Sequence, residues 1–231
     1  MKLAVIPARG GSQRIPRKNI RLFCGKPIIA WSIEAALGSA CFDRVIVSTD
    51  DAEIADVARA CGAEVPSVRP AALADHQTGT MPVVRHAIEA LAADGGAPTL
   101  VCCLYATAPF VTGVDLREGL RLVQQPGCEF AFPVVRYAHP IERSLRLDAE
   151  GRVHMLDPQR FATRSQDLPA TYHDAGQFYW GRSEAWLSAE RIFGPTAAAL
   201  ILPAYRVQDI DTLDDWQRAE ALFQVLQAGG S

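Results

Sequence analysis

The sequence has no apolar run of the ~18 residues that a membrane-spanning helix needs. Its six cysteines form no C-x-x-C pair and lack the histidine spacing of a zinc site, which argues against a metal module and favours reduced core residues. Long basic runs are absent, and the net charge of −3 argues against a general nucleic-acid surface. The first apolar run is too short for a secretion signal and meets Arg9 directly. We therefore expect a cytoplasmic protein that binds neither nucleic acid nor membranes.

Two common phosphate-binding motifs, the Walker A loop and the dinucleotide fingerprint G-x-G-x-x-G, are also missing. A different loop follows the first apolar run, with the basic residues Arg9, Arg14, Arg17 and Lys18 around a Gly-Gly pair. Glycines let main-chain N–H groups approach an anion closely, and arginine or lysine supplies charge where phosphate oxygens converge. The loop can be a basic surface turn, but its position after the first strand of an α/β sheet favours a triphosphate site.

Apolar runs at 3–8, 45–48, 100–104 and 130–135 predict buried strands, and segments of helical period lie between them. This alternation predicts one α/β domain over 1–231, with a Rossmann-like, doubly wound, mostly parallel sheet. Near the end, Thr212 as cap and an apolar stripe from Leu213 through Trp216 and Phe223 to Leu226 predict a helix.

The rhythm of strands and helices breaks at about 136–173, which we interpret as an inserted arm. Residues 145–148 and 153–156 flank a turn at Glu150-Gly151, and this pattern predicts a β-hairpin. The arm can pack on a partner subunit or fold back on its own domain.

Two acidic residues, Asp209 and Asp211, are separated by one residue, so in an extended chain both carboxylates project to one side, within reach of one hard cation. The alternative role for this pair is helix capping. Thr212 and Asp215, just downstream, can already cap the helix, which leaves the pair free to bind a cation.

Several motifs together resemble the opening and later signatures of the acylneuraminate cytidylyltransferases. They cover nearly the whole chain and are, in order, Ile6-Pro7-Ala8-Arg9-Gly10-Gly11-Ser12, Arg14-Ile15-Pro16, Lys18-Asn19-Ile20, Ser48-Thr49-Asp50-Asp51, Arg69-Pro70 with Leu73 and Asp75, Thr107 with Pro109, and Asp209-Ile210-Asp211-Thr212. The resemblance implies a nucleotidyltransferase fold of the glycosyltransferase-A-like type, a homodimer built through the arm, and transfer of CMP from CTP to an acidic nine-carbon sugar.

For the nucleotide, the resemblance implies three overlapping sets of residues. Those expected around CTP are Pro7, Ala8, Arg9, Gly10, Gly11, Ser12, Gln13, Asn19, Arg69 and Thr80. Those expected to act in catalysis are Arg9, Arg14, Lys18 and Asp211, and Asp209 with Asp211 is expected to hold Mg²⁺, for which Mn²⁺ can substitute. Gln13 replaces the lysine that the family usually has beside the serine, and we hypothesise that Arg14 supplies the missing charge.

For the sugar, the resemblance implies Asn19, Tyr105, Thr107, Arg164, Gln166, Gln177 and Tyr179. The segments 105–110 and 172–180 depart from the sialic acid type toward aromatic and ionisable groups, and resemble the pseudaminic acid branch. That sugar has a deoxygenated C9 and a second acylated nitrogen, so a less polar pocket is physically reasonable. The implied product is a CMP-sugar for flagellin glycosylation or a cell-surface polysaccharide.

Three alternatives remain open from the sequence. The same reaction can act on legionaminic acid, N-acetylneuraminic acid or a 3-deoxy-octulosonate. Gln13 motivates a non-catalytic nucleotide-sugar sensor, and the D-x-D pair also occurs in NTP-sugar glycosyltransferases. No residue is identified as the general base.

Overall fold

The computed structural model describes residues 1–74 and 78–229, so Asp75 of the family pattern lies outside the described residues. A seven-stranded sheet has the order β11-β6-β10-β5-β1-β4, with β9 paired to β6. Its strands are β1 (Lys2–Pro7), β4 (Arg44–Ser48), β5 (Leu100–Leu104), β6 (Phe130–Arg136), β9 (Tyr172–Asp174), β10 (Phe178–Arg182) and β11 (Ala197–Leu202). Strands β9 and β10 run antiparallel to their neighbours, whereas the other pairings are parallel. The predicted α/β fold with a mostly parallel sheet is confirmed.

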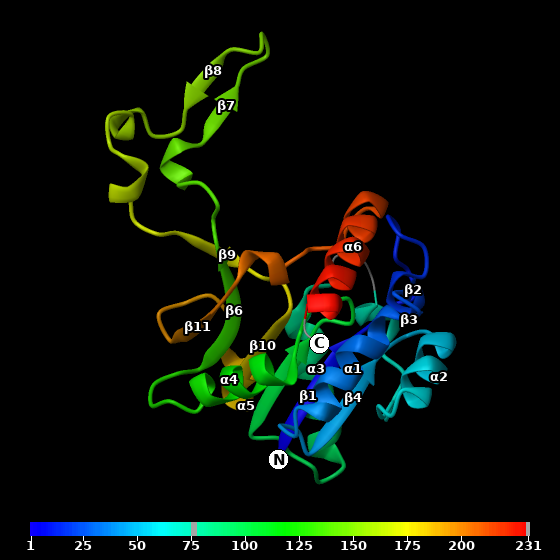
Figure 1. Ribbon diagram of the computed structural model, residues 1–231. Coiled ribbons are helices and arrows are strands. Elements are labelled where there is room, and N and C mark those ends of the chain that lie inside the picture. Colours follow the sequence, from blue (N-terminus) through cyan, green and yellow to red (C-terminus); the bar gives the residue numbers. More distant parts are fainter. Residues whose placement is uncertain (75–77, 230–231) are drawn as a thin grey trace.

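Helices cover both faces of this sheet (Figure 1). They are α1 (Ile28–Gly38), α2 (Ala52–Ala60), α3 (Thr80–Ala93), α4 (Gly113–Val123), α5 (Ser183–Ser188) and α6 (Leu213–Gly229). Side chains of α1, α2 and α4 join the core on one face, and those of α3 and α5 join the core on the other. Two short strands, β2 (Leu22–Phe23) and β3 (Lys26–Pro27), pair with each other before α1.

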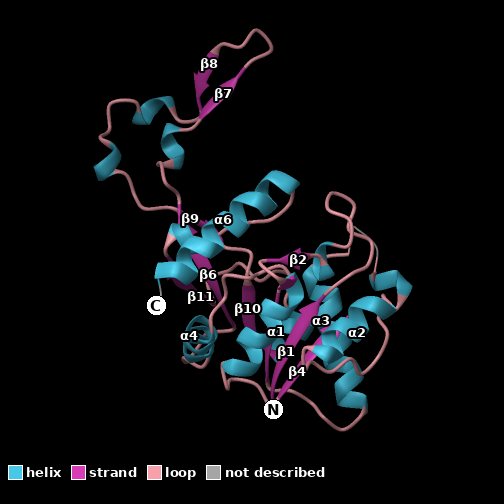
Figure 2. Ribbon diagram, turned by 45° about the vertical axis from the view of Figure 1, so that its right-hand side comes forward, coloured by secondary structure: helices cyan, strands magenta, loops and turns pink. Residues whose placement is uncertain are grey.

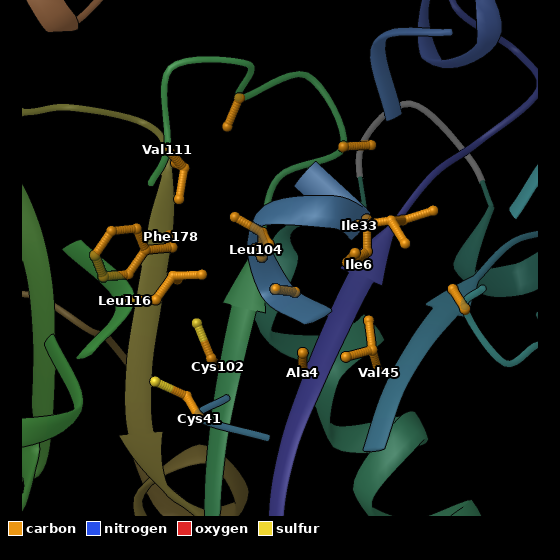
Figure 3. Packing of buried hydrophobic residues seen from close by; sticks show 14 of the residues in the cluster. Ala4, Ile6, Ile33, Cys41, Val45, Cys102, Leu104, Val111, Leu116 and Phe178 are labelled. Atoms are coloured by element: carbon orange, nitrogen blue, oxygen red, sulfur yellow. The ribbon is translucent and has the colours of Figure 1, made fainter. Parts of the chain in front are cut away.

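The alternation of side chains along β1 and β5 divides the core into two layers. Ala4 and Cys102 point into the layer under α1, which Figure 3 shows from close by, whereas Val5 and Cys103 point into the layer under α3. Burial raises the pKa of both thiols, so neither is a ready nucleophile. These two cysteines therefore act as packing residues, as the sequence predicted.

Helix α6 packs on a third cluster, where the Trp216 and Phe223 rings meet the Phe23 ring edge to face with centroids 5.5 and 5.4 Å away. The predicted cap is present, because the Asp215 N–H donates to Thr212 Oγ1 over 3.2 Å. Leu213 was predicted to belong to the buried stripe, and this prediction is wrong. It is 48% exposed, since the stripe that faces the core runs through Trp216 and Phe223 instead.

The chain between β6 and β9 projects away from the sheet, as both overall views show (Figures 1 and 2). It contains the hairpin of β7 (Leu145–Leu147) and β8 (Val153–Met155) and the short 3₁₀ turns η3 (Ile141–Arg143), η4 (Pro158–Arg160) and η5 (Ser165–Asp167). The predicted hairpin is therefore present. Large apolar side chains on this arm are exposed, including Leu147 at 69% and Phe161 at 71%. No helix in the described part of the chain is long and apolar enough to cross a membrane.

Candidate active site

A cavity of about 330 Å³ opens beyond the carboxyl ends of β1 and β5. This is where sheets of this kind bind ligands. Twelve residues that the sequence analysis assigned to CTP, metal or sugar line it: Pro7, Arg9, Ser12, Gln13, Arg14, Lys18, Asn19, Arg69, Thr80, Tyr105, Thr107 and Asp211. Residues from five separate stretches of the chain are thus brought to one place.

At one end of the cavity, cations of the glycine loop meet the late aspartate. Arg14 Nη1 lies 2.9 Å from one carboxylate oxygen of Asp211, and Lys18 Nζ lies 3.5 Å from the other. Arg14 is 67% exposed, so the guanidinium is free to turn toward a ligand that enters from solvent. This end, which we call the phosphate end, combines mobile positive charge with a carboxylate that can face a cation.

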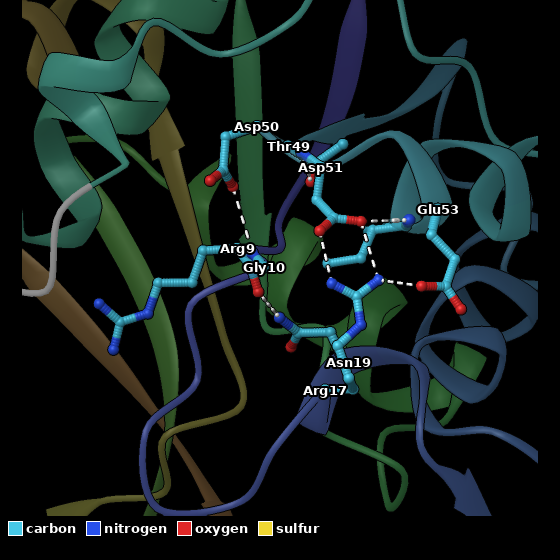
Figure 4. A network of polar contacts seen from close by, with 9 residues as sticks. Arg9, Gly10, Arg17, Asn19, Thr49, Asp50, Asp51 and Glu53 are labelled. Carbon is cyan, nitrogen blue, oxygen red and sulfur yellow. Dashed lines mark hydrogen bonds and ion pairs between the residues drawn. The ribbon is translucent and has the colours of Figure 1, made fainter.

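The glycine loop approaches the β4–α2 turn closely. The Gly10 N–H donates to Asp50 Oδ1 over 3.2 Å, and a Cβ added to Gly10 would lie 2.5 Å from Asp51 Oδ2. The Asn19 side-chain amide donates to the Arg9 carbonyl over 2.9 Å, which ties the two arms of the loop together (Figure 4). Glycine at position 10 is therefore a steric requirement, whereas Gly11 has open space around it.

Arg69 lies deep in the wall of the cavity, with 5% of its surface exposed. Its Nε donates to Ser48 Oγ over 3.1 Å, a second nitrogen donates to the Ser48 carbonyl, and its own N–H donates to the Thr49 carbonyl over 2.8 Å. Burial lowers the pKa of the guanidinium. These contacts fix the side chain, so it presents a rigid set of donors to whatever occupies the cavity.

Another part of the cavity wall, which we call the sugar end, is aromatic. The Tyr105 hydroxyl lies 3.1 Å from Thr80 Oγ1, and the Tyr105 and Tyr179 rings are 5.4 Å apart. The Tyr179 hydroxyl donates to Asp174 Oδ2, and burial raises the pKa of both phenols. Both tyrosines are therefore neutral hydrogen-bonding groups at neutral pH.

Two predicted sugar residues, Gln177 and Tyr179, lie behind this wall and do not line the cavity. Gln177 is 4% exposed, and its side-chain amide donates to the Arg206 carbonyl over 2.9 Å. Its backbone carbonyl accepts from the Tyr105 N–H over 2.9 Å. Both residues support Tyr105 from beneath.

The structure does not bring every predicted residue to the cavity. Arg164 and Gln166 lie on the arm, where Gln166 lines a separate cavity at the arm's base and Arg164 is exposed. Asp209 is exposed and does not line the main cavity, whereas Asp211 does. Ala8, Gly10 and Gly11 belong to the loop without lining the cavity. The roles assigned to these residues stay predictions.

A metal ion would find limited protein coordination here. Within residues 1–74 and 78–229, no group of three or more His, Cys, Asp or Glu side chains is arranged to hold a metal. Among the described residues that line the cavity, Asp211 is the one that carries a carboxylate. That donor set fits Mg²⁺ held by one or two carboxylates, water and the phosphates of a nucleotide, and does not fit a metal caged by protein.

Residues 3–198 match the family model described as cytidylyltransferase. The chain belongs to this cytidylyltransferase family. This cytidylyltransferase is 45% identical over 223 residues, 96% of each chain, to the pseudaminic acid cytidylyltransferase of Campylobacter jejuni subsp. jejuni serotype O:2. It is 33% identical, over 97% of each chain, to the CMP-N,N'-diacetyllegionaminic acid synthase of Legionella pneumophila.

Solved structures share the fold of this cytidylyltransferase at low sequence identity. One is CMP:2-keto-3-deoxy-manno-octonic acid synthetase complexed with CTP, with a TM-score of 0.71, 18% identity, and coverage of 96% of this chain and 98% of that one. Another is 4-diphosphocytidyl-2C-methyl-D-erythritol synthase from Anaerococcus prevotii, with a TM-score of 0.64 and 14% identity.

Sequence reasoning missed the residues of this cytidylyltransferase that hold the glycine loop from outside. Asp50 and Asp51 were noted as part of a family pattern and as alternative caps of the following helix, and Arg17 was grouped with the phosphate cations. The available signal was the helix-cap position of Asp51, which places an acidic side chain beside the carboxyl end of β1.

Proposed function

We propose that this cytidylyltransferase transfers CMP from CTP to pseudaminic acid and releases pyrophosphate. One observation carries the proposal: Arg9, Arg14, Lys18 and Asp211 line a single cavity together with the aromatic end formed by Tyr105. Curated relatives at 45% and 44% identity are named pseudaminic acid cytidylyltransferases, which supports this choice of sugar.

For the nucleotide, the proposal assigns the triphosphate to Arg9, Ser12, Arg14 and Lys18. Guanidinium groups grip phosphate oxygens in a bidentate way, and a serine hydroxyl adds a donor. The fixed and buried Arg69, with main-chain groups near Pro7, is suited to reading a flat base by hydrogen bonds.

In the proposed reaction, the anomeric C2 hydroxyl oxygen of the sugar bonds to the α-phosphorus of CTP. The bond from that phosphorus to the bridging oxygen of pyrophosphate breaks, and the hydroxyl proton is released. Phosphoryl transfer depends on in-line positioning and on offsetting phosphate charge, which Arg14 and Lys18 would do. Gln13 contributes hydrogen bonds without charge, so Arg14 takes the part that a lysine beside the serine would have.

Mg²⁺, with Mn²⁺ as a substitute, is part of the proposal. Asp211 would hold it, and Asp209 would join if its side chain turned toward the cavity. When bound, the ion would offset charge on the triphosphate. Arg14 and Lys18, which pair with Asp211, would then turn to phosphate oxygens.

For the sugar, the proposal assigns Tyr105, Thr107 and Asn19 to direct contact, because all three line the cavity. Aromatic and weakly polar walls suit a sugar that carries a methyl group at C9 and two acylated nitrogens. The nonulosonate carboxylate needs a cation, and Arg164 is the residue assigned to it.

We also propose that the enzyme is a cytoplasmic homodimer joined through the arm. Exposed apolar side chains on the arm, among them Leu145, Leu147 and Phe161, support this assembly because contiguous exposed apolar surface is typical of an interface. Sedimentation is expected to show a dimer. A monomer at all concentrations would remove this part of the proposal.

The test of the reaction is mass spectrometry of products from CTP, Mg²⁺ and a panel of nonulosonates, with pyrophosphate measured in parallel. We expect CMP-pseudaminic acid and equimolar pyrophosphate, and much slower turnover of legionaminic acid, N-acetylneuraminic acid and 3-deoxy-octulosonate. A faster reaction with legionaminic acid would overturn the choice of sugar alone. No pyrophosphate with any sugar would favour a sensor, and release of nucleoside diphosphate would indicate a glycosyltransferase.

A further inference from the structure

Arg17 differs from the other basic residues of the glycine loop. Arg9, Arg14 and Lys18 line the cavity, whereas Arg17 does not. Its guanidinium instead pairs with Asp51 through two hydrogen bonds, of 2.5 and 2.9 Å, and reaches Glu53 over 2.5 Å. Figure 4 shows Arg17 between these two acids, with the Arg9 side chain directed elsewhere. The positive charge of Arg17 is thus neutralised outside the cavity.

The partner of Arg17 is itself held in place. Asp51 caps helix α2 by accepting the Ile54 N–H over 3.0 Å, and its own N–H donates to Thr49 Oγ1 over 3.1 Å. The hydrogen bonds from Arg17 are the main cause of a pKa of about 2 for the Asp51 carboxyl. Asp51 is therefore a charged and fixed anchor at the end of the helix.

The same turn also holds the beginning of the loop. The Gly10 N–H donates to Asp50, and the Gly10 Cα packs so close to Asp51 that no Cβ fits between them. Gly10 and Arg17, at opposite ends of the loop, are thus attached to adjacent residues of one rigid turn. The stretch between them, which carries Ser12 and Arg14, is therefore a loop whose two ends are both attached to this turn.

The backbone of Arg17 shows what this attachment achieves. Arg17 has φ 55°, a left-handed conformation that costs a non-glycine residue free energy. It stands directly before the 3₁₀ helix η1 (Lys18–Ile20), and its carbonyl accepts the Ile20 N–H over 3.0 Å. The turn at this residue sends Arg17 toward α2 and Lys18 into the cavity.

We infer that Arg17 and Asp51 form a clamp that sets the glycine loop in its CTP-binding shape before CTP arrives. Both are positioning residues, because neither lines the cavity. The inference rests on the proposed function for the identity of the ligand. A loop that is already ordered loses less conformational freedom on binding, and so binds more tightly than a loop that must be ordered by its ligand.

The test is a double-mutant cycle in the full-length protein, with Arg17→Met, Asp51→Asn and the double variant. Asparagine keeps the helix cap, and methionine keeps an unbranched chain of similar length without charge. We expect each single variant to weaken CTP binding in calorimetry and to lower kcat/KM for CTP, each roughly 10-fold, with KM for the sugar within about 2-fold of wild type. The double variant should lose no more CTP affinity than the single variant with the larger loss, since the two residues act as one unit.

Two further variants separate positioning from general stability. Arg17→Lys, which restores a cation, should recover part of the lost CTP affinity. Arg59→Met breaks an exposed pair with Asp56 on the same helix and should leave CTP affinity unchanged. Unchanged CTP binding in Arg17→Met would overturn the inference. Additive losses in the double variant would also overturn it, because they would indicate that Arg17 meets the phosphates directly.

Failure of the proposed function has a different signature. If the wild-type protein neither binds CTP nor releases pyrophosphate, the proposed function fails whatever the variants do. The clamp is then judged by amide hydrogen exchange over residues 10–19. Faster exchange in Arg17→Met with an intact melting transition would support the clamp, and unchanged exchange would overturn it.

Discussion

The two ends of the cavity are built in opposite ways. At the phosphate end, Arg14 and Lys18 are held by ion pairs to Asp211, and Arg14 is 67% exposed. At the sugar end, Tyr179 is buried and Tyr105 is half-buried. Both are neutral, with Tyr105 hydrogen-bonded to Thr80 and Tyr179 to Asp174. The phosphate end thus consists of ion-paired charged side chains, and the sugar end consists of aromatic side chains fixed by hydrogen bonds.

This difference indicates how each end recognises its ligand. Exposed ion pairs contribute only about 0–1 kcal/mol to folding, so the exposed Arg14 is available to change partners. Buried polar groups that lose a partner cost about 1–3 kcal/mol, so the tyrosines hold one geometry. We therefore expect changes at the phosphate end to affect catalysis and CTP, and changes at the sugar end to affect the choice of sugar.

The largest expected effect is that of Asp211→Asn. Because Asp211 carries a carboxylate into the cavity and pairs there with Arg14 and Lys18, its loss should lower kcat by roughly 10²–10³-fold. Pyrophosphate release measured against Mg²⁺ concentration checks this, and removal of the metal with a chelator should stop wild-type turnover. Asp214→Asn, at an exposed position in the first turn of α6, is the matched control. If Asp214→Asn proved equally damaging, Asp211 would have no special role.

Arg14→Ala should have the next largest effect, roughly 100-fold on kcat/KM for CTP, because one guanidinium contact to phosphate is lost. The companion Gln13→Lys should restore part of the rate in the Arg14→Ala background, since it returns a cation beside Ser12. Steady-state kinetics in both backgrounds decide the point. Full turnover in Arg14→Ala, with no gain from Gln13→Lys, would contradict the role given to Arg14.

A smaller effect, confined to the sugar end, is expected for Tyr179→Phe. Removing the hydroxyl frees Asp174 and loosens the wall behind Tyr105. We expect KM for the sugar to rise roughly 5–10-fold, with KM for CTP within about 2-fold, which corresponds to about 1 kcal/mol. The exposed Tyr205→Phe serves as control. An equal rise in KM for both substrates would show that the two ends are not separable.

The smallest expected effect is on stability in acid. The pKa of Asp51 is about 2 in the folded protein and 3.8 ordinarily, chiefly because of the Arg17 hydrogen bonds. Its contribution is therefore fully present above about pH 4 and is lost as the pH falls toward 2. Urea unfolding of wild type and Asp51→Asn should differ by about 1 kcal/mol at pH 7, because the pair is partly exposed, and the difference should vanish near pH 2. A difference that stays constant across that range would exclude the ion pair as its source.

Most of the framework could be predicted from the sequence. Buried strands such as 100–104 appear as uninterrupted apolar runs between turn residues, and the cap at Thr212 precedes an apolar helical stripe. Both are local signals, so tertiary contacts were not needed to read them. The phosphate end followed from the same locality, because Arg9, Ser12, Arg14 and Lys18 lie in one short loop.

What could not be predicted depends on contacts between distant segments. The sequence does not indicate that Arg17 points toward Asp51 whereas Lys18 points into the cavity. This difference depends on the left-handed backbone conformation of Arg17. In the same way, Tyr105 and Tyr179 stand in two separate aromatic segments of the sequence. Those segments do not indicate that Tyr105 lines the cavity whereas Tyr179 packs behind it. Arg69 is also buried through a contact with a distant segment, because it hydrogen-bonds to Ser48 at the end of β4. The local sequence Arg69-Pro70 is typical of an exposed loop and does not indicate this burial.

Strand β10 makes the order of synthesis important for this enzyme. It lies between β5 and β6, so both of those strands leave the ribosome well before their shared neighbour exists. During that interval each has an unpaired edge, and such edges are where nascent chains associate with one another. The sugar end, which needs Tyr179 of β10, is completed late. Slower translation at low temperature, or added chaperone, should therefore raise the yield of active enzyme from an overexpressing cell.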